Sequence, residues 1–164
     1  MNNESNSGGN FCTTVGAFAA TGAVTTHATT NVINYAIDGI GYTKAAITGG
    51  VTPVLDVNGK AVSISANQAR SVVWALNAAG TVVVLAGPIV AWDGGITAPN
   101  YGFNNAVPEL PNLSPLYTAF AITVLKAAAT TVGVWNLGTG LWNATGISVV
   151  HKNVLNMPSR PLLV

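Results

Sequence analysis

Charged residues are scarce in this chain of 164 residues. Six residues are Lys or Arg and five are Asp or Glu, so the charged share is 7% and the formal net charge at pH 7 is +1. Globular proteins ordinarily carry about 25% charged residues. The six basic residues do not cluster, which argues against nucleic acid and anionic membranes as partners, because both bind concentrated positive charge.

The low charge has two explanations. The surface could consist mainly of Thr, Asn and Ser, as in extracellular β domains. Alternatively, neighbouring subunits could cover much of the surface, since the cores of protein interfaces are depleted in charged residues. We favour the second explanation.

Cysteine and long apolar runs are also lacking. The single cysteine, Cys12, excludes an internal disulfide, which fits a protein assembled in the cytoplasm. The apolar run from Val82 to Trp92 contains Gly87 and Pro88, whereas about 18 uninterrupted apolar residues are needed to cross a membrane. The N-terminal sequence MNNESNSGGN has no basic residue, so we expect no signal peptide.

Turn sequences between β-branched segments predict an all-β fold. Asp38-Gly39 separates two alternating segments and predicts a hairpin, because these residues tolerate the positive φ angles of a tight turn. Asn58-Gly59 predicts a second hairpin between two strands, and the loop 77–80 predicts a third.

Two further segments define the strand pattern. The apolar run that ends at Pro88 is typical of a strand covered on both faces, and Pro88 ends regular pairing because it has no backbone donor. Residues 119–130 are rich in Ala and could be helical, but Ile122, Thr123 and Val124 favour a strand.

We therefore expect a single compact antiparallel β-sandwich or barrel, jelly-roll-like, with extended arms at both ends. Residues 1–24 form an N-terminal arm and a first strand, residues 25–153 form the β domain, and residues 154–164 form an extended tail. Within the domain, residues 93–115 form a long loop rich in Pro, Asn and Gly. Strand order and sheet closure do not follow from periodicity.

No pattern for catalysis, metal binding or cofactor binding is present. His27 and His151 have no further ligand at metal-site spacing, so we expect structural or surface roles. Cys12 has no cationic neighbour that would activate its thiol. Three acidic residues lie in turn sequences: Asp38, Asp56 and Asp93. A turn aspartate usually bonds its own backbone, so we expect no catalytic residue, no metal, no cofactor and no enzymatic activity.

The four tryptophans allow two interpretations. Trp74, Trp92, Trp135 and Trp142 could form a platform on which a carbohydrate or a base stacks. Because they lie in Val-rich segments, we favour anchors in the core or in an interface.

Four strings resemble small structural proteins of tailed-bacteriophage virions, among them head-decoration-like products: TTHATTNVINYAIDGIGYTKAAI, ISANQARSVVWALNAAGTVVV, LWNATGISVV and MPSRPLLV. The resemblance covers most of the chain from about Thr25 and leaves residues 1–12 unmatched. It implies a capsid decoration or cement protein on the virion surface, synthesised in the host cytoplasm. Its implied partners are the major capsid protein and further copies of itself, as a trimer or dimer.

Two alternatives remain open. A head or tail fibre module would bind a host glycan or receptor through the tryptophans. A small hydrolase is less favoured, because no acid–base pair occurs at credible spacing.

Composition and expected extension predict contacts with partners in residues 2–12, 93–115 and 154–164. An arm that becomes ordered on a neighbouring subunit adds contacts that a compact body cannot reach. The predicted interface residues, in or beside these segments, are Phe11, Trp92, Tyr101, Phe103, Leu110, Leu155, Met157, Arg160 and Leu162.

Overall fold

The computed structural model describes residues 9–92 and 108–157. Within these residues the protein has thirteen β-strands and no helix, which confirms the predicted all-β fold. All strand pairs that the structure describes are antiparallel. The sheets pack as an open sandwich, so the barrel that the sequence left open is wrong. The described part of the chain contains no helix that could cross a membrane.

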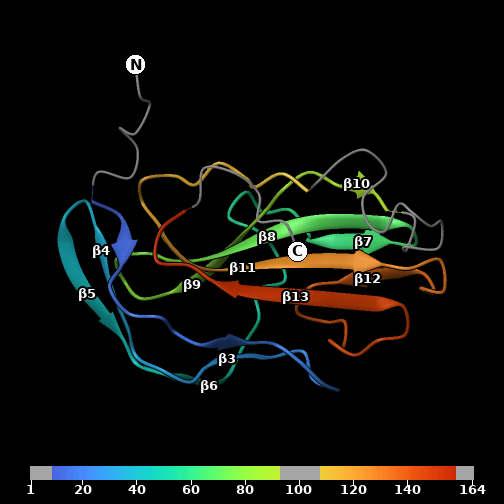
Figure 1. Ribbon diagram of the computed structural model, residues 1–164, viewed down its shortest axis with the longest axis horizontal. Helices are drawn as coiled ribbons and strands as arrows, with labels where there is room; N and C mark the ends of the chain where they lie inside the picture. The colour runs from blue at the N-terminus through green and yellow to red at the C-terminus, as the bar shows by residue number, and fades with distance from the viewer. Residues whose placement is uncertain (1–8, 93–107, 158–164) are drawn as a thin grey trace.

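A five-stranded sheet forms the centre of the molecule. Its strands are β8 (Gln68–Leu76), β9 (Val82–Ala86), β10 (Val90–Ala91), β11 (Thr118–Ala127) and β13 (Ile147–Asn153). The order is β10-β8-β11-β13, and β9 also pairs with β8. Figure 1 shows β8, β11 and β13 side by side along the long axis. The predicted strand within 119–130 is therefore confirmed, and β11 is the longest strand of the described chain.

Three small sheets complete the fold: β1 (Phe11–Cys12) with β4 (Ile33–Ile37) and β5 (Ile40–Lys44); β2 (Phe18–Ala19) with β3 (His27–Thr29) and β6 (Ile47–Gly50); and β7 (Ser63–Ser65) with β12 (Val134–Asn136). In Figure 1 the hairpin β4–β5 lies at one end of the long axis, and β7 and β12 lie toward the other. The small sheets place their apolar residues against one face of the central sheet.

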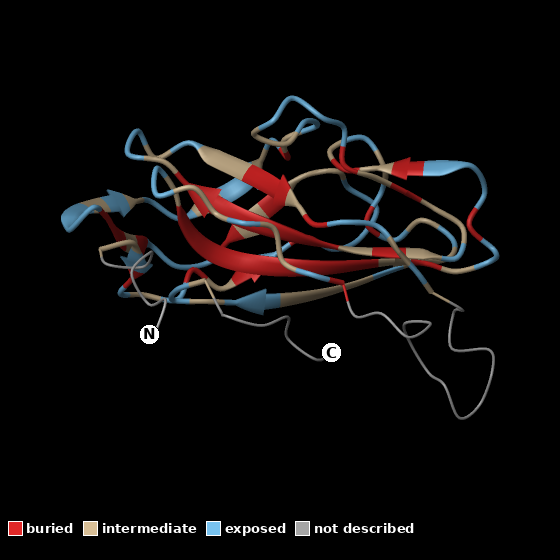
Figure 2. Ribbon diagram, turned by 90° about the horizontal axis from the view of Figure 1, so that it is seen from above, coloured by how far each residue is buried: buried red, intermediate tan, exposed pale blue. Residues whose placement is uncertain are grey.

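The central sheet buries side chains on both faces. Along β8, Val72, Trp74 and Leu76 point to one face and Val73 and Ala75 to the other, because successive side chains of a strand alternate. All five are fully buried, and the two sets belong to two apolar clusters. Figure 2 shows this burial along the central strands, whereas the two ends of the molecule are mostly exposed.

Irregular segments cover the second face of the sheet. Partly buried residues from these segments and from β9 pack on the cluster that contains Val73 and Ile122: Val57, Val83, Leu110, Leu113, Tyr117, Val154 and Met157. Near the centre of β9, Val84 lies in the first cluster and Leu85 in the second. This confirms the predicted strand covered on both faces.

The predicted turns are found, with one correction. Asp38 and Gly39 have φ angles of 52° and 75°, the combination of a type I′ hairpin turn, and they connect β4 to β5 in register. The loop 77–80 connects β8 to β9 as predicted.

The hairpin predicted around Asn58-Gly59 is reduced to one bridge between Leu55 and Ala61. Pro53 has no backbone donor, and the Asp56 side chain accepts the N–H groups of Asn58 and Lys60. The local turn therefore replaces a longer ladder.

The N-terminal residues that the structure describes pack into the body. Cys12, Phe18 and Ala20 belong to the main core. The backbone N–H of Phe18 donates to Oδ1 of Asn153 at 2.8 Å, so β2 is connected to the last strand. Residues 1–8, most of the predicted long loop (93–107) and the end of the predicted tail (158–164) lie outside the described residues.

Candidate functional site

The nine predicted interface residues fall into four groups. Phe11 and Leu155 are 42% and 44% exposed. Leu110 and Met157 are partly buried and pack within the protein on the second cluster. The remaining described residue is Trp92, which is partly exposed and lies under Lys126, whose Nζ is 5.9 Å from the centre of the indole ring. Four predicted interface residues lie outside the described residues: Tyr101, Phe103, Arg160 and Leu162.

Three of the four tryptophans are core residues. Trp74, Trp135 and Trp142 are 0%, 5% and 3% exposed, and their rings follow one another at centroid distances of 6.4 and 5.4 Å. Their indole N–H groups donate to Thr123 Oγ1, to the Leu141 carbonyl and to a backbone carbonyl of the loop before β3. Because their faces and donors are used inside the fold, these three tryptophans do not offer a stacking platform.

The two histidines lie against this aromatic row. His151 has a pKa lowered by burial, partly offset by its hydrogen bond to the Ala20 carbonyl. The Ala20 carbonyl can only accept a hydrogen bond, so Nε2 of His151, 2.8 Å away, carries a proton and donates to it. Because burial lowers its pKa, the ring is neutral at pH 7, so Nδ1 accepts from the Thr123 hydroxyl at 2.7 Å, and that oxygen in turn accepts the Trp74 indole N–H. His151 thus connects β13 to β11 and to the segment that follows β2.

His27 is more isolated. It is 2% exposed, its ring centre lies 5.1 Å from that of Trp74, and its Nδ1 lies 3.3 Å from Thr52 Oγ1. Within the described residues its Nε2 atom has no hydrogen-bond partner. Burial, and in second place the charge of Lys44, lower the pKa of His27 to about 4. A second proton on this ring would create a buried positive charge without a compensating partner among the described residues.

The other candidate reactive groups that the structure describes are buried or lie in turns. Burial raises the pKa of the Cys12 thiol to about 12, so it carries almost no thiolate at neutral pH. Asp38 lies in the β4–β5 turn, and Asp56 caps its own turn. Asp93 lies outside the described residues. In residues 9–92 and 108–157, no three His, Cys, Asp or Glu side chains gather as a metal site.

An exposed apolar surface lies where the two ends of the described chain meet. We define the terminal patch as Phe11, Leu116 and Leu155, which are 42%, 67% and 44% exposed. The backbone N–H of Cys12 donates to the Leu155 carbonyl at 2.5 Å. The Asn10 side chain donates to the carbonyls on both sides of Leu116. These bonds keep the three apolar residues on adjacent, fixed segments.

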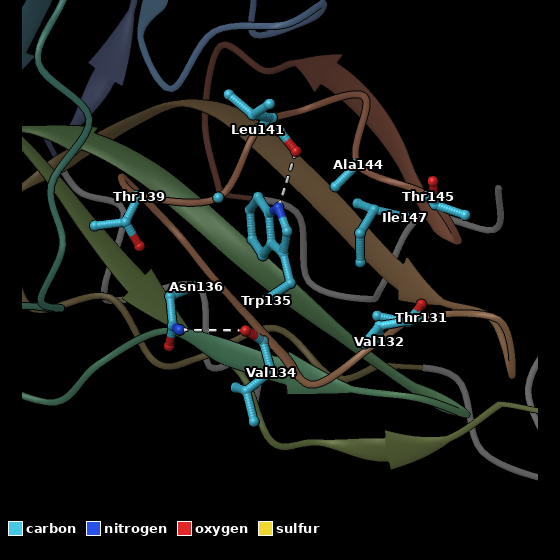
Figure 3. A pocket seen from close by; sticks show the side chains of 11 residues that line it. Thr131, Val132, Val134, Trp135, Asn136, Thr139, Leu141, Ala144, Thr145 and Ile147 are labelled. Atoms are coloured by element: carbon cyan, nitrogen blue, oxygen red, sulfur yellow. Dashed lines mark hydrogen bonds between the residues drawn. The ribbon is translucent and has the colours of Figure 1, made fainter.

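A second apolar surface surrounds an open cavity of about 420 Å³, shown in Figure 3. The cavity lies beside β12 and the start of β13, and Trp135 and Ile147 are among its lining residues. We define the cavity rim as Val132, Val134 and Leu141, which are 94%, 57% and 44% exposed.

The loop at the cavity is held by Trp135. Its indole N–H donates to the Leu141 carbonyl at 2.9 Å, as Figure 3 shows. Gly140 lies so close to the indole that a Cβ at this position would collide with the ring. No described lining residue is charged. Polar side chains such as Thr131, Asn136 and Thr139 line it together with the apolar ones. The cavity is therefore suited to an uncharged group.

The cavity rim and Leu116 were not among the residues predicted from the sequence. Val132 and Val134 stand in the string TTVGVW, which has the composition of a buried strand. In the structure Val132 stands next to Gly133, whose φ is 72°, and Val134 points to the side of β12 opposite the buried Trp135. The glycine between the two valines was the only sign of a turn in this string. An interpretation based on hydrophobic periodicity does not take a single glycine into account. Comparison of the chain with protein-family models, curated proteins and solved structures finds no match.

Proposed function

We propose that this protein is a non-enzymatic virion structural protein, a capsid decoration or cement subunit that bridges neighbouring capsid subunits. One observation supports the proposal most. Fourteen large hydrophobic side chains of the described residues are at least 42% exposed, whereas the entire chain has eleven charged residues. Single exposed apolar residues are common, but grouped ones are typical of surfaces that bind other proteins.

Two such groups suit a bridging role. The two surfaces share no residue. The terminal patch consists of residues 11, 116 and 155, and the cavity rim consists of residues 132, 134 and 141. A protein with two apolar surfaces can contact two neighbours at once. Stable assemblies commonly bury about 2,000 Å² or more, and their interface cores contain few charges. The proposed partners are the major capsid protein and further copies of this chain.

The alternative of a glycan-binding fibre module receives less support. Stacking on a sugar requires an exposed aromatic face, and among the described tryptophans only Trp92 is exposed beyond 5% of its surface. Its ring lies next to Lys126. A glycan array without a hit, together with unchanged adsorption to host cells after Trp92→Ala, would exclude this alternative.

The test of the proposal uses virus particles with and without this protein. Particles that lack it should release DNA at a lower temperature than complete particles, which a DNA-binding dye measures during heating. Adding the purified protein should restore the release temperature. Equal release temperatures, with no protein sedimenting with the particles, would contradict the proposal.

Single substitutions connect this test to the two surfaces. Leu155→Asp in the terminal patch and Leu141→Asp in the cavity rim should each weaken binding to particles by about tenfold or more. Val32→Asp is the matched control, because Val32 has the same 44% exposure as Leu141 and Leu155 and belongs to neither surface. A loss as large for the control would show that no particular surface is involved.

A further inference from the structure

The strand β5 (Ile40–Lys44) is a regular sheet edge. It pairs with β4 over five residues without a shift in register, and within the described chain it has no second partner strand. Ile40, Gly41 and Thr43 are exposed. Exposed edges of this kind bind a further strand unless charge, Pro or a bulge prevents it, and the only charged residue of β5 is Lys44 at its end.

Other edges of the described chain are modified. On the outer side of β9, the Val84 carbonyl accepts a hydrogen bond from the backbone N–H of Val57. The strand β6 contains Gly49 at a φ of 60°, which interrupts extended geometry. The last strand, β13, is bonded by β2 through the side chain of Asn153. Of these edges, β5 is therefore the one best suited to pair with another strand.

The β4–β5 turn determines which backbone groups of β5 point outward. In a two-residue hairpin the residues that flank the turn, here Ile37 and Ile40, exchange hydrogen bonds, and the pattern alternates along the strands. Tyr42 and Lys44 consequently bond to β4. The N–H and C=O groups of Gly41 and Thr43 point away from β4.

We infer that β5 pairs with β5 of a second copy, antiparallel and related by a two-fold axis at Tyr42. In this register Gly41 lies opposite Thr43 of the second copy, and Thr43 lies opposite its Gly41. The outward donors and acceptors of both strands then pair with each other in two reciprocal sets. Registers centred on Gly41 or Thr43 leave some of these groups unpaired or place them opposite residues outside β5.

The side chains fit the same register. Tyr42 lies opposite its own copy in a pair without hydrogen bonds, where side chains are closest. Because Tyr35 and Tyr42 already stack at 5.5 Å, the pairing extends an aromatic row across the axis. Lys44 lies opposite Ile40 of the second copy, so the two positive charges stay apart. The exposed side chain of Ile40, at 60%, gains the aliphatic stem of Lys44 as a neighbour.

The proposed function includes contacts between copies of this chain, and the β5 pairing describes one such contact. Its role on a capsid rests on the proposed function, whereas the pairing itself does not. An edge of five residues provides a small interface, so we expect a dissociation constant in the range of about 10 to 100 µM for the isolated protein. On a capsid lattice, a high local concentration would strengthen the same contact.

Sedimentation velocity of the purified protein over about 5 to 500 µM tests the inference. The wild type should change from monomer to dimer, and Thr43→Pro should weaken dimerisation by about tenfold or more, because it removes an outward N–H that β4 does not use. Thr43→Val is the matched control: it keeps the backbone donor and loses only the hydroxyl that bonds Asn34, so it should dimerise like the wild type. A wild type that stays monomeric to the highest concentration would overturn the inference.

Disulfide trapping tests the register and does not depend on the proline variant folding. A mixture of Ile40→Cys and Lys44→Cys proteins should form a crosslinked dimer on mild oxidation, because these positions are opposite each other. Each variant alone should not crosslink. The native Cys12 is 3% exposed and stays in all variants. The register would be overturned if each variant crosslinked alone, or if the mixture formed no crosslinked dimer.

These outcomes are separate from those of the capsid experiment. A protein that dimerises through β5 without binding particles contradicts only the proposed function. A protein that binds particles and remains monomeric contradicts only the strand pairing. Deletion of residues 1–8 tests whether the chain's own N-terminal segment competes for the β5 edge. If dimerisation appears only after this deletion, that segment covers β5 and the inference is wrong for the full chain.

Discussion

Acid should destabilise this protein through His27. The unfolded chain protonates a histidine near the ordinary pKa of about 6.5, whereas the folded protein resists protonation until its pKa of about 4. Between these values the unfolded state binds more protons than the folded state, so the free energy of unfolding decreases as the pH falls. The loss begins below about pH 7 and levels off below about pH 4.

The size of the effect follows from the two pKa values. From pH 7.5 to pH 5, the linkage relation gives a loss of at most about 2 kcal/mol for His27, reduced to the extent that water screens the charge. This is a considerable share of the roughly 5–15 kcal/mol that stabilises a typical domain. His151 acts in the same direction, because burial also lowers its pKa.

Urea denaturation followed by tryptophan fluorescence at several pH values between 5 and 7.5 measures the loss. The variant His27→Gln cannot titrate, so its free energy of unfolding should depend less on pH than that of the wild type, by up to about 2 kcal/mol over this range. His151→Gln serves as the comparison for the second histidine. A wild type equally stable at pH 5 and pH 7.5, or a variant with the wild-type pH dependence, would refute the reasoning.

Two further predictions concern packing and reactivity. Gly87→Ala should destabilise the protein by about 1–3 kcal/mol in thermal unfolding, because a Cβ there meets the Glu109 carbonyl and the Ser71 hydroxyl. Gly41→Ala, with nothing within 4 Å of its Cβ, should stay within about 0.5 kcal/mol of the wild type, and equal effects would contradict the packing argument. Cys12, with its pKa raised to about 12 by burial, should react with a thiol reagent at pH 8 about a thousandfold more slowly in the folded protein than in urea. Similar rates in both states would show that the thiol is accessible.

The parts of the fold that depend on neighbouring residues could be predicted from the sequence. Asp38-Gly39 determines a type I′ turn because both residues accept positive φ angles, and the turn then sets the register of β4 and β5. The pairing of β8 with β11 joins segments that are separated in the chain by β9, β10 and residues 93–107, and no local pattern specifies it. The weakened ladder at Asn58-Gly59 results from competition by the Asp56 side chain, which a turn motif does not reveal.

The exposed surfaces were only partly predictable. Phe11 and Leu155 are accessible, but Leu110 and Met157 serve as a cover for the second cluster within the protein. Sequence composition cannot distinguish an apolar residue that packs on its own sheet from one that stays exposed and can contact another protein. That distinction depends on which face of the central sheet lacks a second sheet. Here that face is closed by irregular segments.

The bond between Phe18 and Asn153 has a consequence for biosynthesis. These residues are 135 positions apart in the chain, so a ribosome that adds about 5–20 residues per second needs roughly 7 to 27 s to supply the partner of β2. During this interval the nascent chain carries unburied Phe18 and Cys12 side chains. The contact between β2 and β13 therefore forms only after Asn153 has been translated, and until then these apolar side chains are a target for chaperones.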